Sequence, residues 1–133
     1  MIWLLDGNVL VALTLSTHLH HRAAHVWFRA QKRRFATCPS TEGALLRVLM
    51  GPHAELSASE AWGLLARIRH LDGHVFWADT LSYADVPTKG ILGHRQVTDA
   101  FLAQLARAQG GKVATFDTGF HRLQPDATEL VPA

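Results

Sequence analysis

The chain has 133 residues, of which 48% are hydrophobic and 18% charged. This length and balance predict one folded domain over residues 1–133 and exclude intrinsic disorder. The 13 Lys and Arg residues outnumber the 11 Asp and Glu residues by two, which is too small an excess to indicate nucleic-acid binding by itself. The single cysteine, Cys38, excludes an internal disulfide framework, and no apolar run approaches the ~20 residues of a membrane span. We therefore expect a cytoplasmic protein.

Short apolar runs alternate with segments of helical periodicity along the chain. The runs expected to form buried strands are residues 2–5, 35–38, 75–77, 112–116 and 129–131. The segments expected to form helices are residues 8–15, 18–33, 40–50, 57–71 and 96–109. Residues 79–94 are expected to be irregular, and Ser57 with Glu60 has the spacing of a capping box. Strands separated by helices predict an α/β fold with a mainly parallel sheet covered on both faces.

Four acidic residues fall at the ends of predicted strands or in the first turns of predicted helices: Asp6, Glu42, Asp99 and Asp117. Because the carboxyl ends of parallel strands meet at one edge of a sheet, these carboxylates are expected to line one pocket there. Each position also has a structural explanation. Acids stabilise first helical turns by ~0.3–1 kcal/mol, and an aspartate after a strand commonly caps the helix that follows.

Four carboxylates in one pocket would require protons or a cation. At ~5 Å and an effective dielectric constant of about 20, each like-charged pair repels by roughly 3 kcal/mol. Oxygen ligands, with no cysteine and no obviously placed histidine among them, select Mg²⁺ or Mn²⁺ over zinc. The pattern therefore predicts a site for Mg²⁺, with Mn²⁺ as a substitute.

The residues around these acids resemble the four acidic motifs of PIN-domain ribonucleases, and especially of VapC toxins from toxin–antitoxin pairs. The motifs are residues 4–10 (LLDGNVL), 41–42 (TE), 97–100 (VTDA) and 114–117 (ATFD), with further similarity at residues 36–39, 46–49 and 110–117. The resemblance covers nearly the whole chain. It implies a three-layer α/β/α sandwich and a Mg²⁺-dependent endoribonuclease that acts as a toxin. It also implies a homodimer and a cognate antitoxin protein that neutralises it.

Hydrolysis of an RNA phosphodiester by such a protein assigns roles to the four acids. Asp6, Asp99 and Asp117 are the expected metal ligands, and Glu42 is expected to lie behind them or to orient the attacking water. Asn8 and Thr115 are expected to support them, although a helix N-cap and an ordinary strand residue are equally good interpretations. The RNA-binding residues, the number of metal ions and the roles of Asp79 and Asp85 are left open.

Other polar residues have simpler interpretations. His21 and His25 have a spacing that zinc can use, but a solvated or RNA-facing helix over residues 18–25 is favoured. Cys38 is expected to be buried rather than nucleophilic. The basic residues 32–34 end a helix, where cations are favourable, and contact with RNA phosphate is the other interpretation.

The apolar content exceeds what a core of this size can hold, so some apolar surface is expected to remain outside. The segments around Trp27 and Trp62 are the expected sources, while tryptophans in general are expected in the core or at interfaces. On the helix expected over residues 18–33, the residues placed on or near the buried side are Ala24, Val26, Trp27, Phe28 and Ala30.

Two other functions are kept as alternatives. One is a non-catalytic module with a PIN-like fold that binds RNA or a partner, against which the four intact acids argue. The other is a Mg²⁺-dependent phosphatase, suggested by the apolar strand that ends in Asp6. That chemistry needs a second aspartate as general acid, and Asn8 stands in its place.

Overall fold

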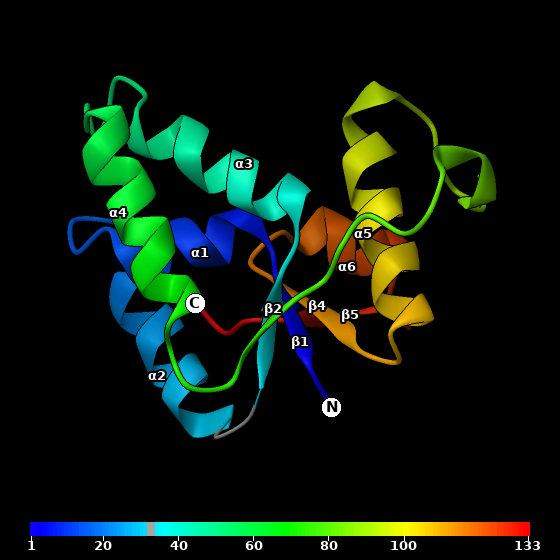
Figure 1. Cartoon of the computed structure of the whole chain (residues 1–133). Helices are drawn as coiled ribbons and strands as arrows, with labels where there is room; N and C mark the ends of the chain where they lie inside the picture. Colours follow the sequence, from blue (N-terminus) through cyan, green and yellow to red (C-terminus); the bar gives the residue numbers. More distant parts are fainter. Residues whose placement is uncertain (32–33) are drawn as a thin grey trace.

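The computed structural model describes residues 1–31 and 34–133, over which strands and helices alternate (Figure 1). The strands are β1 (Trp3–Leu5), β2 (Phe35–Thr37), β3 (His74–Phe76), β4 (Lys112–Thr115) and β5 (Thr128–Leu130). The helices are α1 (Gly7–Thr14), α2 (His21–Gln31), α3 (Pro39–Leu49), α4 (Ala58–Arg69), α5 (Val97–Ala108) and α6 (Thr118–Leu123). Two 3-10 turns, η1 (Tyr83–Asp85) and η2 (His94–Gln96), lie in and just after the segment expected to be irregular. No helix in the described part of the chain is long and apolar enough to cross a bilayer.

The five strands form one sheet in the order β3-β2-β1-β4-β5, and neighbouring strands all pair in parallel. The predicted parallel sheet is therefore confirmed. Strand β1 is central, because Leu4 pairs with Ala36 of β2 on one side and with Val113 of β4 on the other. Leu5 pairs with Ala114, so the carboxyl ends of β1 and β4 lie side by side.

Helices cover both faces of the sheet and so confirm the three-layer α/β/α sandwich. Figure 1 shows α1, α2, α3 and α4 on one side and α5 and α6 on the other. Successive side chains of a strand point to opposite faces, and on β1 Trp3 and Leu5 join the core beneath α1 to α4. Leu4 joins the second core, with Phe101 of α5 and Phe120 of α6.

Helix α1 approaches α3 closely at its first residue, Gly7. A Cβ atom at this position would lie 2.8 Å from the Cβ of Ala44, which is closer than real Cβ atoms come. The backbone N–H of Gly7 also donates a 2.7 Å hydrogen bond to Oδ1 of Asp6, the residue that caps α1. The absence of a side chain at Gly7 thus lets the first turn of α1, with Asp6 at its start, sit against α3.

Helix α2 buries a narrower stripe than expected. Ala24 and Trp27 are buried, whereas Val26 is 57% exposed and Ala30 is also exposed. The prediction for Val26 and Ala30 was wrong because a 3.6-residue period turns these positions away from the face that carries Ala24 and Trp27. On α4, Trp62 is 54% exposed, which confirms the apolar surface expected there.

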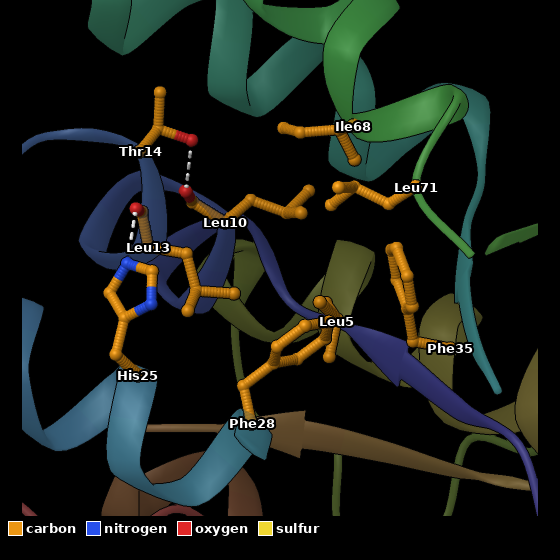
Figure 2. A pocket seen from close by; sticks show the side chains of 9 residues that line it. All are labelled: Leu5, Leu10, Leu13, Thr14, His25, Phe28, Phe35, Ile68 and Leu71. Atoms are coloured by element: carbon orange, nitrogen blue, oxygen red, sulfur yellow. Dashed lines mark hydrogen bonds between the residues drawn. The ribbon is translucent and has the colours of Figure 1, made fainter. Parts of the chain in front are cut away.

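A small apolar cavity of about 160 Å³ lies between the sheet and helices α1, α2 and α4 (Figure 2). Figure 2 shows the Thr14 hydroxyl bonded to the carbonyl of Leu10 and the His25 ring bonded to the carbonyl of Leu13. The other lining residues are Leu5, Phe28, Phe35, Ile68 and Leu71. This lining carries no carboxylate, so the cavity is not a place for the predicted metal chemistry.

Candidate active site

The side chains of Asp6, Asn8 and Thr115 join the carboxyl ends of β1 and β4. Asp6 Oδ2 accepts a 2.8 Å hydrogen bond from the Thr115 hydroxyl and a 3.4 Å hydrogen bond from Asn8 Nδ2. Asn8 Nδ2 also lies 3.3 Å from Thr115 Oγ1, and its Oδ1 accepts from the backbone N–H of Phe116 at 3.2 Å. Asn8 and Thr115 therefore both contact the groups around Asp6. Because Asp6 caps α1, the interpretation of Asn8 as the N-cap was wrong.

Asp117 is tied to the same hydroxyl and begins α6. Its backbone N–H donates to Thr115 Oγ1 at 3.0 Å, and its Oδ1 accepts from the backbone N–H of Phe120 at 3.1 Å. Asp117 is thus the N-cap of α6, as the position of an aspartate after a strand suggested. Helix α6 has six residues, too few for its periodicity to be read from the sequence.

Three aspartates act on one another electrostatically. Burial raises the pKa of Asp6, and the charge of Asp117 adds to the rise, while hydrogen bonds from Thr115 and Gly7 oppose it. Burial raises the pKa of Asp99 to about 7, with further contributions from the charges of Asp6 and Asp117. Asp99 comes from the first turn of α5, on the far face of the sheet from α1. The charges of Asp6 and Asp117 therefore reach Asp99, and a single pocket lined by the three carboxylates stays a prediction.

Glu42 contacts Thr37 rather than the three aspartates' supporting residues. It lies in the first turn of α3, and its Oε2 accepts a 2.7 Å hydrogen bond from the hydroxyl of Thr37, the last residue of β2. Across residues 1–31 and 34–133, no three His, Cys, Asp or Glu side chains are arranged to hold a metal ion. A pocket lined by all four carboxylates, and the metal ligands within it, therefore stay predictions.

A groove of about 520 Å³ begins at Asp6 and runs between α1 and α3. A groove of this size falls in the range that accommodates small ligands. Asp6 and Asn8 line it, and the remaining lining residues are Gly7, Val11, Leu15, Thr17, His18, Ala44, Val48 and His53.

The histidines of residues 18–25 have structural contacts. The rings of His21 and His25 donate to the backbone carbonyls of Ala12 and Leu13 at 2.8 and 2.9 Å, and they lie edge to face 4.4 Å apart. These bonds satisfy carbonyl groups in the last turn of α1, which have no hydrogen-bond partner within the helix. Their bonded nitrogens are poor zinc ligands, and an RNA-facing role for this helix stays a prediction.

Three further expectations can be placed. Cys38 is buried, and burial raises the pKa of its thiol, which confirms a structural residue. Asp85 completes the capping box of η1 by accepting from the N–H of the N-cap Ser82 at 3.1 Å, and Asp79 is exposed. Of the basic residues 32–34, the first two lie outside the described residues.

Two site neighbours were not identified from the sequence. Thr37 contacts Glu42, and its position at the end of an apolar strand is a signal that could have found it. His74 contacts Thr37 from β3 at 2.7 Å, and no motif or spacing in the sequence points to it.

Comparisons with known proteins agree with this fold. Residues 3–124 match the model of the PIN domain family. The chain is 46% identical to Ribonuclease VapC29 of Mycobacterium tuberculosis over 132 residues, covering 99% of this chain and 98% of that protein. It is 43% identical to Ribonuclease VapC38 of the same organism over 124 residues, covering 90% of this chain and 88% of that protein.

Solved structures share the fold at low sequence identity. VapC20 of M. tuberculosis, described as a Sarcin-Ricin loop cleaving toxin, superposes with a TM-score of 0.70 at 16% identity, covering 92% of this chain and 94% of that one. VapBC2 from Rickettsia felis, solved bound to a DNA fragment from their promoter, gives 0.67 at 16% identity, covering 99% and 100%. The parallel sheet, its two helical layers and the match to the family model define a PIN domain. Within that family, the chain belongs to the VapC ribonucleases.

Proposed function

We propose that this chain is a metal-dependent endoribonuclease, folded as one domain over residues 1–133, and the toxin of a toxin–antitoxin pair. The observation that carries the proposal is the mutual effect of Asp6, Asp99 and Asp117, which contributes to a pKa of about 7 for Asp99. A carboxyl group with such a pKa is a functional-site candidate. Helix capping explains the positions of Asp6 and Asp117. It does not explain why Asp99 is within reach of their charges.

The donor chemistry fits a hard divalent cation. The candidate ligands are carboxylate oxygens, which Mg²⁺ and Mn²⁺ prefer. The raised pKa of Asp99 indicates that the three carboxylates are difficult to ionise together without compensating positive charge. Asp6, Asp99 and Asp117 would hold the ion, which when bound supplies Lewis-acid activation of the phosphodiester and of water.

The protein's own groups supply position and orientation. Thr115 and Asn8 hold the Asp6 carboxylate at the end of β1. Glu42, fixed through its Oε2, would orient the water that attacks the phosphorus, and the groove that starts at Asp6 would receive the RNA strand. Asn8 uses both ends of its amide in contacts with the end of β4. This use argues against the phosphatase alternative, which requires an acid at that position.

The toxin role and the antitoxin partner rest on the relatives. VapC20 is described as a toxin and VapBC2 as a complex on promoter DNA, and we extend an antitoxin partner to this chain. Exposed apolar side chains on the helices would form the contacts with such a partner and with a second copy in a homodimer. They include Val26, Val48 and Trp62, with Met50 directly after α3. The proposed substrate is RNA in the cytoplasm.

RNA cleavage by the purified protein tests the proposal. We expect cleavage with Mg²⁺ or Mn²⁺ and none with EDTA. Asp99→Asn should reduce the rate by at least 100-fold, because it removes one charge from the site. The matched control is Asp72→Asn, which changes an exposed aspartate away from the site. RNA binding without cleavage under every condition would instead support the non-catalytic alternative.

A further inference from the structure

A chain of hydrogen bonds leads from β3 to Glu42. The Thr37 hydroxyl lies 2.7 Å from Glu42 Oε2 and 2.7 Å from Nε2 of the His74 ring. Thr37 is fully buried, so water cannot replace either contact. The three residues come from three different elements, and their contact depends on the parallel pairing of β2 with β3.

The chemistry of the groups sets the direction of both bonds. A hydroxyl has one proton to donate, and an ionised carboxylate can only accept. The Thr37 proton therefore goes to Glu42 Oε2, and His74 must donate its Nε2–H to the Thr37 oxygen. This arrangement selects the Nε2–H tautomer of the His74 ring.

The surroundings of His74 suit this task. Its ring packs edge-on against Phe35, with the ring centres 5.3 Å apart, which fixes its plane. Burial lowers the pKa of His74, and the nearby positive charge of Arg69 lowers it further, against the opposing effect of Glu42. A ring that is neutral near pH 7 has one N–H to donate.

We propose that His74 is a positioning residue, which fixes the Thr37 hydroxyl and through it the carboxylate of Glu42. Holding Oε2 also fixes the direction of Oε1, the oxygen that would meet the attacking water. The inference deepens the proposed function and rests on it for the role of Glu42. The hydrogen-bond chain itself can be tested without any nuclease activity.

The first test is NMR spectroscopy of the histidine rings in the metal-free protein. The ¹H–¹⁵N correlations of His74, assigned by their loss in His74→Gln, should show the Nε2–H tautomer in the wild type. Thr37→Val, which keeps the shape and removes the hydroxyl, should abolish that preference, whereas Thr37→Ser should retain it. An Nδ1–H tautomer in the wild type would overturn the inference.

The second test is steady-state RNA cleavage in the presence of Mn²⁺. His74→Leu should lower kcat by about 10–100-fold, the usual loss for an outer contact of a metal site, with KM unchanged. His74→Gln, which can place an amide N–H near the same point, should recover most of the rate. His70→Leu is the matched control, because His70 is exposed at the end of α4.

If His74→Leu fails to fold, Thr37→Val should cause the same loss in kcat without altering β3. A double-mutant cycle then shows whether the effect passes through Glu42. In a Glu42→Gln background, which should itself be slow, Thr37→Val and His74→Leu should cause no further loss. An undiminished loss in that background, or full activity of Glu42→Gln, would overturn the positioning role while the nuclease function stands.

If the wild type cleaved no RNA, the proposed function would fall and the positioning role with it. The NMR result would still show whether the hydrogen-bond chain exists.

Discussion

The hydroxyl of Thr115 is the common contact of two candidate ligands. It donates to Asp6 Oδ2 and accepts from the backbone N–H of Asp117. Its direct effect on Asp6 is to lower the carboxyl pKa, against the larger effect of burial. One buried side chain therefore contacts the groups at the ends of both β1 and β4.

Asp99→Asn should abolish RNA cleavage and yet stabilise the metal-free protein at pH 8. The substitution removes a charge that burial, Asp6 and Asp117 all disfavour. Because Asp99 is only half-buried, solvent screening reduces the gain to about 1 kcal/mol, or a few degrees in Tm. Thermal unfolding in EDTA measures it, with Asp72→Asn as the control. A Tm lowered by many degrees would mean that Asp99 is a structural residue.

The stability of the metal-free protein should also depend on pH through Asp99. Its pKa is about 7 in the folded state and near 3.8 when exposed, so the folded state binds the proton more tightly. The contribution of Asp99 to stability is therefore greatest in acid and is lost as the pH rises through 7. Urea unfolding from pH 5.5 to 8 should show a decrease that is smaller in Asp99→Asn. Equal slopes in the two proteins would contradict the raised pKa.

The contacts of Asn8 and Thr115 with Asp6 could be predicted from the sequence, but the contacts behind Glu42 could only be predicted in part. Asp6 and Asp117 follow apolar strands, and this simple rule places both at the sheet edge. The contact between Thr37 and His74 could not be predicted, because it depends on which strands are neighbours. Strand order is a property of the whole chain, and local sequence does not encode it.

The helices with a long apolar periodicity were predicted from the sequence, whereas the short helix α6 was not. Helix α5 has twelve residues and a continuous buried face, which its sequence pattern displays. Helix α6 buries only Phe120 and owes its start to the Asp117 cap. Stabilisation of this kind comes from tertiary packing and one hydrogen bond, neither of which produces a recognisable period.

The contact between α1 and α3 leads to a prediction for Gly7→Ala. The new methyl group would lie 2.8 Å from the Cβ of Ala44, so one helix must shift at a cost of about 1–3 kcal/mol. Because Asp6 directly precedes Gly7, the same shift should lower the rate of RNA cleavage. Urea unfolding and a cleavage assay measure the two effects.

Gly63→Ala is the matched control, since Gly63 lies within α4 and a Cβ there has open space. It should stabilise the protein by about 0.5–1 kcal/mol, the usual preference for alanine in a helix. Restoring room with Ala44→Gly should recover cleavage in the Gly7→Ala protein. If Gly7→Ala were as stable and active as the wild type, the close approach of α1 to α3 would not be needed for stability or cleavage.

At the scale of the whole molecule, the alternation of strands and helices was enough to predict a parallel sheet between two helical layers. The division of the helices between the faces was not predictable from periodicity, because either face offers an equivalent apolar surface. This division matters for the site, since Asp99 arrives from the α5 side and Asp6 begins a helix on the other side.

An antitoxin that acts at the carboxylates should compete with the metal ion. A basic side chain that compensates these charges would lower RNA cleavage and Mn²⁺ affinity together, because coupling between two ligands is reciprocal. Calorimetric Mn²⁺ titrations of the free toxin and of the complex measure this. Unchanged affinity in a fully inhibited complex would show instead that the antitoxin blocks the path of the RNA.

The central position of β1 has a consequence for biosynthesis. Strand β1 leaves the ribosome well before β4, its neighbour in the sheet. At translation rates of about 5–20 residues per second, Asp6 waits on the order of 5–20 s for Asp117 to be added. A nascent chain that ends before β4 has Asp6 but neither the Thr115 hydroxyl nor the Asp117 carboxylate. A nascent chain therefore cannot bring these two carboxylates together until β4 and Asp117 have been made.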